Sequence, residues 1–256
     1  MHNNRWTKEQ TIVAFNLYCK IPFQKASSSN PDIIKIANII GRSPNSVKMK
    51  IGNFGSFDPE LKKQGIVGLT NASKLDREVW NEFNHDWEKL AFQSESLIAK
   101  FLNKNIEEVG LDEPLKLPEG LSKTRLVKTR VNQAFFRRSV LSAYNSTCCV
   151  TGLKIPQLLI ASHIIPWSKA NNKTEKTNPR NGICINALHD RAFDQGYMTI
   201  TPDYMIKVSE KLFDIQNNKI TDGLFKNIMN KNILLPNRFL PKREFLEYHN
   251  RYIFKD

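Results

Sequence analysis

Residues 157–196 constrain the fold of this chain most strongly, because a strand pattern gives way there to a helix pattern around two histidines. Residues 157–167 (QLLIASHIIPW) form an apolar run that carries His163 shortly before a proline, which is typical of a buried strand. A loop over 168–179 follows. Residues 181–196 (NGICINALHDRAFDQG) then indicate the start of a helix, the helix itself and a glycine stop at Gly196. The pattern therefore places His163 and His189 on two different elements.

The two histidines and the asparagine between them suit the hydrolysis of a phosphodiester. That reaction needs a base for the attacking water and a cation that offsets the charge of the transition state. His163 has a titration range suited to a base, and His189 could bind a metal through a neutral ring nitrogen. Asn181 could tie the intervening loop together. Each histidine taken alone is as well explained as a structural residue, so the prediction depends on their combination.

Five ordered segments resemble the HNH (ββα-metal) endonucleases, and specifically the restriction-associated HNH subfamily. They are 130–137 (RVNQAFFR), 148–152 (CCVTG), 161–167 (ASHIIPW), 178–182 (NPRNG) and 189–196 (HDRAFDQG). The resemblance implies that His163 is the general base, that Asn181 is the structural asparagine of the motif and that His189 is a metal ligand. It also implies cleavage of DNA that leaves 5′-phosphate and 3′-hydroxyl ends.

The candidate metal ligands differ at one position from those of many relatives. Many relatives carry Asp or His immediately before the base, whereas this chain has Ser162 there, a poor ligand. We expect Mg²⁺ or Mn²⁺ to be held by His189, Ser162 and Asp194, with Asp190 as an alternative and with phosphate oxygens and water completing the shell. Asp194 could equally form an ion pair. The four cysteines lack paired CxxC spacing, so they are expected to be buried thiols without structural zinc.

Charge and hydropathy indicate which kind of partner the protein binds and in which compartment it occurs. The formal net charge is +13, which favours a polyanion and predicts double-stranded DNA as the partner. No apolar run reaches the roughly 18 residues of a membrane span, and the first residues lack the apolar core of a signal peptide. The sequence therefore predicts a cytoplasmic protein that does not bind membranes.

Three helices are predicted at the start of the chain. Thr7 with Gln10 forms a capping-box pattern for a helix that runs to about Cys19. A second helix starts at Asn30-Pro31 and stops at Gly41, and a third starts at Ser43-Pro44.

The short connection between the second and third helices is typical of a helix-turn-helix motif, although a plain helical bundle would give the same pattern. In the third helix Val47, Ile51 and Phe54 share one face. The polar residues that this face leaves for solvent or DNA are predicted to be the recognition surface: Asn45, Lys48, Lys50 and Asn53.

The charge balance changes along the chain and suggests the domain boundaries. Residues 76–113 are rich in acids, and their aromatic residues at helical spacing predict core rather than a stacking platform. A proline-containing, basic linker is predicted over 113–129, between a helical DNA-recognition domain at 1–112 and a nuclease domain with a C-terminal tail at 130–256. The residues expected to contact phosphates from the linker and the nuclease domain are Arg125, Lys128, Arg130, Arg137, Arg138, Lys169, Arg180 and Arg191.

The expected fold is thus α+β: an N-terminal helical, helix-turn-helix-like domain followed by a ββα-metal nuclease domain. The expected function is metal-dependent DNA cleavage in restriction or phage defence by a homodimer, because one such site per chain needs two chains to cut both strands. Two alternatives stay open, namely a catalytically inactive DNA-binding regulator, which Ser162 would favour, and a strand-nicking enzyme of the homing or repair type.

Overall fold

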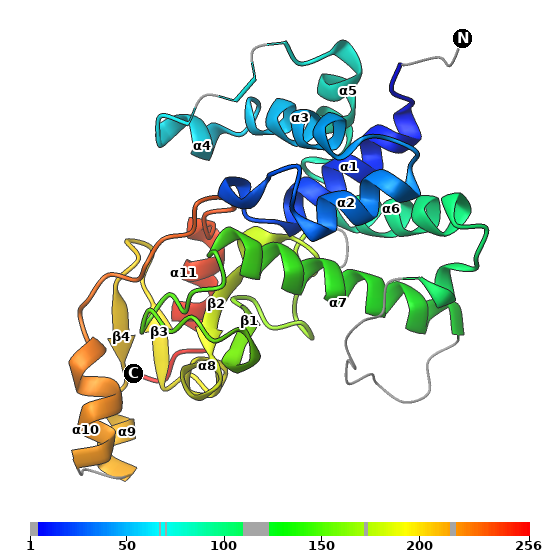
Figure 1. Cartoon of the computed structure of the whole chain (residues 1–256). Helices are drawn as coiled ribbons and strands as arrows, with labels where there is room; N and C mark the ends of the chain where they lie inside the picture. The colour runs from blue at the N-terminus through cyan, green and yellow to red at the C-terminus, as the bar shows by residue number, and fades with distance from the viewer. Residues whose placement is uncertain (1–4, 67, 70, 110–122, 172–173, 216–218) are drawn as a thin grey trace.

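The long helix α7 (Lys123–Ala143) runs through the middle of the molecule and separates a helical region from a region that contains all the described strands. Figure 1 shows α1 to α6 on one side of α7, and the strands with α8 to α11 on the other. The computed structural model describes residues 5–66, 68–69, 71–109, 123–171, 174–215 and 219–256, and side chains within α7 from residue 126 onward. Among these residues no helix has the length and apolar character needed to cross a membrane.

The first three helices begin and end where their capping residues predict. Helix α1 (Lys8–Lys20) has Thr7 and Gln10 as a complete capping box, and α2 (Pro31–Ile39) is capped by Asn30. Gly41 has a φ of +66°, which suits the stop after α2. Ser43 caps α3 (Pro44–Gly55), whose predicted apolar face is fully buried. These predictions are confirmed.

The rest of the helical region closes around these three helices. It consists of η1 (Phe23–Lys25), α4 (Pro59–Lys63), α5 (Lys74–Phe83), α6 (Trp87–Phe101) and η2 (Ile106–Glu108). Trp80, Phe83, Trp87 and Leu90 are buried, as predicted for core residues. Rings of α1, α3, α5 and α6 meet at Phe15, whose centroid lies 4.8 Å from Phe54 and 5.3 Å from Trp80. Aromatic packing therefore joins the acidic helices to the first three.

Helix α7 packs against α1 and α6 on one side and against the first two strands of the chain on the other. It begins at Lys123, inside the range 113–129 that the sequence analysis assigned to a linker, while residues 110–122 lie outside the described part of the chain. A single helix thus contacts both regions, between which the sequence predicts a linker.

The region after α7, for which the sequence predicts a nuclease domain, contains a hairpin and a short helix. After η3 (Pro156–Leu158), β1 (Leu159–His163) pairs antiparallel with β2 (Gly182–Asn186), and η4 (Pro179–Asn181) precedes β2. Helix α8 (Ala187–Asp194) follows, and Gly196 stops it at a φ of +74°. The pattern over 182–186 predicts the start of a helix, and this prediction is wrong. Ile183, Cys184 and Ile185 are fully buried between α7 and α8, and their pairing with β1 makes this apolar run a strand.

The C-terminal part covers the far side of α8. It contains a second antiparallel pair, β3 (Met198–Ile200) with β4 (Ile206–Val208), then α9 (Lys211–Ile215), α10 (Lys219–Phe225), η5 (Lys226–Ile228) and α11 (Arg243–Tyr252). The predicted C-terminal tail contains the helix α11. The described architecture is a mostly helical N-terminal region followed by small hairpins with a helix, so the predicted α+β class is confirmed.

Candidate active site

His163 ends β1 on the face of the hairpin that packs against α7. Its ring stacks on Phe136 of α7 with 3.6 Å between centroids, and its centroid lies 5.4 Å from that of Trp167, whose ring is almost perpendicular to it. Opposite His163, Gly182 allows this close approach, because a Cβ there would lie 2.5 Å from Val140 and 2.7 Å from Phe136. Helix α7 therefore forms one wall of the candidate site.

The protonation state of His163 follows from its hydrogen bond. Nε2 lies 2.9 Å from the main-chain oxygen of Lys176, which can only accept a hydrogen bond. The neutral ring must therefore carry its proton on Nε2 and a free lone pair on Nδ1. Burial lowers the pKa of His163 to about 4, so the ring is neutral at pH 7. A neutral imidazole with a lone pair on a known atom is what a general base requires.

Asn181 holds the loop that supplies this oxygen. Its side chain is fully buried, and its Oδ1 accepts from the main-chain nitrogen of Ile165 at 2.8 Å. Nδ2 donates to the oxygen of Ile165 at 3.2 Å and to that of Glu175 at 3.3 Å. The main-chain oxygen of Asn181 also accepts from Ile164 at 2.9 Å. Asn181 thus closes the loop between β1 and β2, immediately beside Lys176.

His189 lies in the first turn of α8, and both of its ring nitrogens are in contact with polar groups. Asn186 caps the helix through the main-chain nitrogen of His189, and its Nδ2 lies 2.8 Å from His189 Nδ1. Nε2 lies 3.1 Å from the main-chain oxygen of Leu224 in α10, so this nitrogen donates. His189 is only 3% exposed, and the ring of Phe225 lies 5.4 Å away. In this arrangement His189 secures the start of α8 and its contact with α10.

Ser162, Asp190 and Asp194 form a second polar group, on the opposite side of β1 from His163. Side chains alternate along a strand, so Ser162 faces α8 whereas the neighbouring His163 faces α7. Asp190 and Asp194 are four residues apart and share one face of α8. The Ser162 hydroxyl is close enough to Asp190 to favour its charged form, although it is a buried atom without a hydrogen bond of normal geometry.

The two carboxylates have raised pKa values. Partial burial raises the pKa of Asp190. Partial burial and then repulsion from Asp190 raise the pKa of Asp194 to about 6, although much of the Asp194 residue remains in contact with solvent. Across the described residues, no ion pair neutralises either carboxylate. A cation bound between them would lower both pKa values.

Ser162, Asp190 and Asp194 fit a hard divalent cation as a partial set of oxygen ligands. Mg²⁺ is commonly held by one or two carboxylates together with substrate phosphates and water. In the described part of the chain, His, Cys, Asp and Glu residues nowhere form a group of three or more that could hold a metal ion by themselves. The structure therefore brings Ser162 and Asp194 together with Asp190, and turns His189 toward Asn186 and Leu224 instead.

The cysteines are all buried and free, as predicted. Burial raises the pKa values of Cys149 and Cys184, the latter to about 12, so these thiols stay protonated. Cys149 also donates its main-chain N–H to Cys184 at 2.7 Å, which fastens the residues before β1 to β2.

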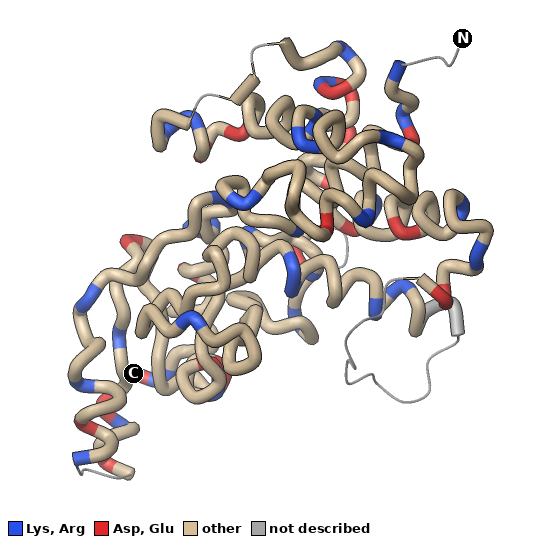
Figure 2. The backbone as a smooth tube through the Cα atoms, viewed as in Figure 1, with Lys and Arg blue, Asp and Glu red and all other residues tan. Residues whose placement is uncertain are grey.

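The predicted phosphate contacts of the nuclease half occupy different environments. Lys128 pairs with Glu88 at 3.1 Å and Arg138 with Asp32 at 3.0 Å. Arg137 donates to the main-chain oxygen of Leu159 at 3.0 Å, and Arg180 pairs with Glu60. Lys169 and Arg191 are exposed, Arg130 is half-buried, and the side chain of Arg125 lies outside the described residues. Lys and Arg occur in both halves of the molecule, including α4 and α7 (Figure 2).

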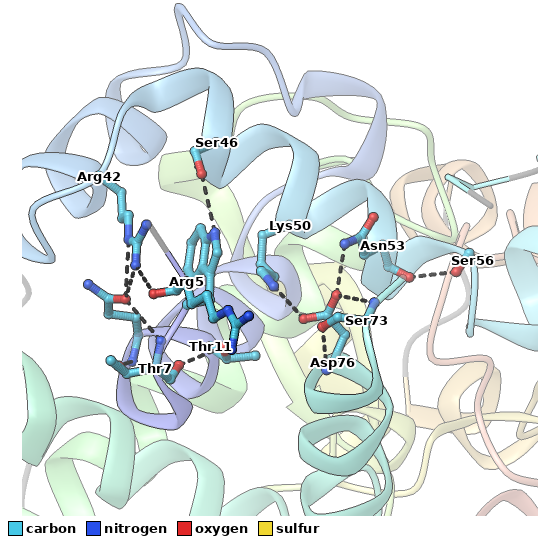
Figure 3. A network of polar contacts seen from close by, with 12 residues as sticks. Arg5, Thr7, Thr11, Arg42, Ser46, Lys50, Asn53, Ser56, Ser73 and Asp76 are labelled. Atoms are coloured by element: carbon cyan, nitrogen blue, oxygen red, sulfur yellow. Dashed lines mark hydrogen bonds and ion pairs between the residues drawn. The ribbon is translucent and has the colours of Figure 1, made fainter. Parts of the chain in front are cut away.

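On α3 the predicted recognition surface is divided between the protein interior and solvent. Lys50 is only 5% exposed and forms an ion pair with the fully buried Asp76 of α5. Asn53 donates to the same carboxylate at 2.8 Å, and the main-chain nitrogen of Ser73 does so at 3.0 Å (Figure 3). The expectation that Lys50 and Asn53 face solvent or DNA is therefore wrong. Their side chains lie on the flank of α3 that packs against α5.

The exposed side of α3 still carries Asn45 and Lys48. Near its start, Trp6 donates to Ser46 at 3.3 Å and lies between two cations, with Lys50 4.6 Å and Arg42 5.2 Å from the ring. These contacts hold the segment before α1 against α3, the helix that is predicted to recognise DNA (Figure 3).

The sequence named Asp194 and Asp190 as candidate ligands but not as a pair, although their spacing by four residues was a readable signal for one helix face. The contacts of His163 with Phe136 and with the oxygen of Lys176 had no such signal, because one comes from a distant helix and the other from the main chain.

Comparison with known proteins agrees with this geometry. A search of curated proteins returned no match. A family model described as HNH endonuclease matches residues 148–201, a span that contains β1, β2 and α8 together with His163, Asn181 and His189. Residues 148–201 therefore form an HNH endonuclease domain.

Proposed function

We propose that this chain is a metal-dependent endonuclease that hydrolyses phosphodiester bonds of double-stranded DNA, with His163 as the general base. The main support is the hydrogen bond from His163 Nε2 to Lys176, which leaves the Nδ1 lone pair available to take a proton from water. Stacking on Phe136 holds the plane of the ring. General-base catalysis of this kind typically contributes about 10²- to 10⁴-fold in rate.

The metal is proposed to bind through Asp190, Asp194 and the hydroxyl of Ser162. The support is that the Ser162 hydroxyl is buried beside Asp190 without a hydrogen bond of normal geometry, and that both carboxylates, which lie on one face of α8, have raised pKa values. A divalent cation held here would stabilise negative charge on the phosphate and on the leaving oxygen. Asn181 keeps the base in place through the loop, and His189 keeps α8 in place through Asn186.

The helical region is proposed to contact the DNA backbone through a basic cavity as well as through Lys48 and Asn45. This cavity, of about 680 Å³, lies between α4 and the start of α5, and its cationic lining residues are Lys62, Lys74 and Arg77. The described lining residues include no acid, and Arg77 lies 3.8 Å from the centre of the Phe57 ring. Such a surface suits phosphate groups rather than base edges.

The test of the function uses the full chain on supercoiled and linear plasmid DNA with Mg²⁺ or Mn²⁺, and with EDTA as the metal-free control. We expect cleavage that requires the metal and leaves 5′-phosphate and 3′-hydroxyl ends. Linear product from supercoiled plasmid would support double-strand cutting by a homodimer, whereas nicked circles alone would favour a strand-nicking enzyme. DNA binding without any cleavage, with either metal, would favour the inactive regulator that Ser162 suggests.

We also propose a role in restriction or phage defence, which rests on the sequence resemblance. Its test is to compare cleavage of unmodified and modified DNA of the same sequence. Equal cleavage of both, at random sites, would contradict that role while leaving the nuclease function intact.

A further inference from the structure

We propose that Glu60, on α4 of the helical region, is a positioning residue for the nuclease site and acts through Arg180 on the loop that holds His163. The two residues are 120 positions apart in the sequence and belong to opposite sides of α7. The catalytic consequence rests on the function proposed above. The structural consequence does not, and the experiment below measures both separately.

Glu60 joins three segments at one carboxylate. Its side chain is 14% exposed and forms an ion pair with Arg180 Nη1. The main-chain nitrogen of Leu240 donates to both carboxylate oxygens, at 3.3 and 3.2 Å. Arg180 also contacts the main-chain oxygen of Leu240 at 3.4 Å, and its own main-chain oxygen accepts from Lys242 at 3.2 Å. The residue before Asn181 is thus held against α4 and the C-terminal segment.

From Arg180 a continuous series of hydrogen bonds leads to the base. Arg180 and Asn181 are consecutive in the single turn η4, so a shift of one moves the other. Asn181 bonds to Ile165, beyond the end of β1, and to Glu175 on the opposite side of the loop. The next residue after Glu175 is Lys176, whose oxygen fixes the tautomer of His163. A displacement at Arg180 would therefore reach the atom that orients the base.

The docking of the C-terminal segment does not depend on Glu60 alone. Arg238 is 1% exposed and donates to the main-chain oxygens of Tyr18 at 2.6 Å and Ile21 at 2.8 Å, and to Ser142 at 2.9 Å. Gln64 also donates to the oxygen of Asn237 at 2.8 Å. Substitution of Glu60 would therefore leave this segment attached to α1, α4 and α7. The substitution removes the carboxylate that forms an ion pair with the Arg180 guanidinium.

The effect should be on the geometry of the base rather than on DNA affinity. Without its carboxylate, the partly buried guanidinium regains hydration by turning outward, which pulls on η4. Small displacements of a reacting group produced far from the chemistry can lower a rate by up to about 100-fold. In the Glu60 variants the rate at saturating DNA should fall while KM changes little, because Glu60 is an acidic residue that contacts no DNA in this proposal.

The experiment compares Glu60→Ala, Glu60→Gln and Arg180→Met in the full chain with a matched control, Glu95→Ala. Glu95 pairs with Lys20 at 2.6 Å between α1 and α6, and its 13% exposure is close to that of Glu60, but it has no contact with the nuclease loop. Glutamine at position 60 keeps an acceptor for Leu240 and removes only the charge. Amide hydrogen exchange over 160–181, kcat, KM and Tm are measured for each variant, together with the double variant Glu60→Gln with Arg180→Met.

Glu60→Ala and Glu60→Gln should both increase exchange in 160–181, where Ile164 and Ile165 donate to Asn181, and lower kcat by about 10- to 100-fold. Glu95→Ala should lower Tm without either effect. The double variant should be no worse than Arg180→Met alone, because the two residues act as one unit. Unchanged exchange in 160–181 in Glu60→Gln, or equal losses of kcat in the Glu60 and Glu95 variants at equal Tm, would overturn the proposal. If the parent chain cuts no DNA, the proposed function fails and the exchange data alone decide the role of Glu60.

Discussion

Carboxylates of the helical region and of the nuclease region have different kinds of partner. Asp76 in the helical region is fully buried and has Lys50, Asn53 and the main chain of Ser73 as partners. Asp190 in the nuclease region lies close to the Ser162 hydroxyl, which makes no hydrogen bond of normal geometry, and the charge of Asp190 raises the pKa of Asp194. A carboxylate that holds a fold together is compensated within the protein, whereas one that binds an ion is left incomplete.

The same contrast applies to the basic residues. In the helical region Lys50 appeared to be a DNA contact in the sequence and is an internal counter-ion in the structure. In the nuclease region Lys169 and Arg191 remain exposed and without an ion pair among the described residues. The following predictions test whether the two regions differ in the way that these contacts suggest.

The largest effect is expected from removal of the base. His163→Ala should lower the cleavage rate by about 10²- to 10⁴-fold and leave DNA binding almost unchanged, since His163 contacts Phe136 and the loop rather than the proposed phosphate contacts. Plasmid cleavage and a gel-shift titration measure the two properties. A folded His163→Ala protein that cuts at the parent rate would refute the assignment of the base.

Loss of the compensated carboxylate should destabilise the fold instead. Asp76→Ala leaves Lys50 buried without a counter-ion, and breaking a buried pair in this way typically costs about 3 to 5 kcal/mol. Glu78→Ala is the control, because Glu78 pairs with Lys74 on the surface at 3.8 Å and its loss should cost less than about 1 kcal/mol. Urea unfolding measures both. If the two variants lose similar stability, Asp76 has no special role in the fold.

The incomplete carboxylates should matter for metal affinity rather than for stability. Asp190→Asn with Asp194→Asn should weaken Mn²⁺ binding by at least about 10- to 100-fold and raise stability slightly, because mutual repulsion disappears. His189→Ala should lower Tm through the lost contacts with Asn186 and Leu224, with a smaller change in Mn²⁺ affinity. Isothermal titration with Mn²⁺ measures this. If His189→Ala weakened Mn²⁺ binding more than the double aspartate variant did, the metal would bind at His189, and α10 would have to move away from that residue.

The last prediction concerns pH, and its effect should begin in the nuclease region. Burial lowers the pKa values of His163 and His249 to about 4, below the ordinary value of 6.5. The unfolded chain therefore takes up these protons first as pH falls. The stability that these two neutral histidines contribute is fully present above pH 6.5. It is lost as pH falls toward 4, by at most about 1.4 kcal/mol per pH unit for each histidine.

Thermal unfolding between pH 7 and pH 4.5 tests this, with His249→Gln as the comparison. His249 stacks on Phe193 at 3.7 Å and contacts Thr199, so the variant has a lower Tm throughout but should show a shallower dependence on pH. Hydrogen exchange at pH 5 should increase in 159–200 before it increases in 8–55. Earlier loss of protection in the helical region would contradict the proposed difference between the regions.

The helix ends could be predicted because their signals are local. Thr7, Asn30 and Ser43 each satisfy main-chain N–H groups two or three residues ahead, so they mark the start of a helix whatever surrounds it. The strand β2 was missed for the complementary reason. An apolar run such as Ile183 to Ile185 suits a buried helix or a buried strand, and its pairing with β1 across the loop decides between them.

The sequence by itself determined the helix caps, the apolar face of α3, the free cysteines and the order of His163, Asn181 and His189. These depend on residue type and on spacing within one turn or one strand. Only the tertiary structure decided that Lys50 is internal, that Asp190 lies beside Ser162, that His189 contacts α10, and that Glu60 reaches Arg180. Each of these contacts joins two elements that are separated in the sequence. Their free energy depends on burial and charge, which arise only when α7 brings the two regions together.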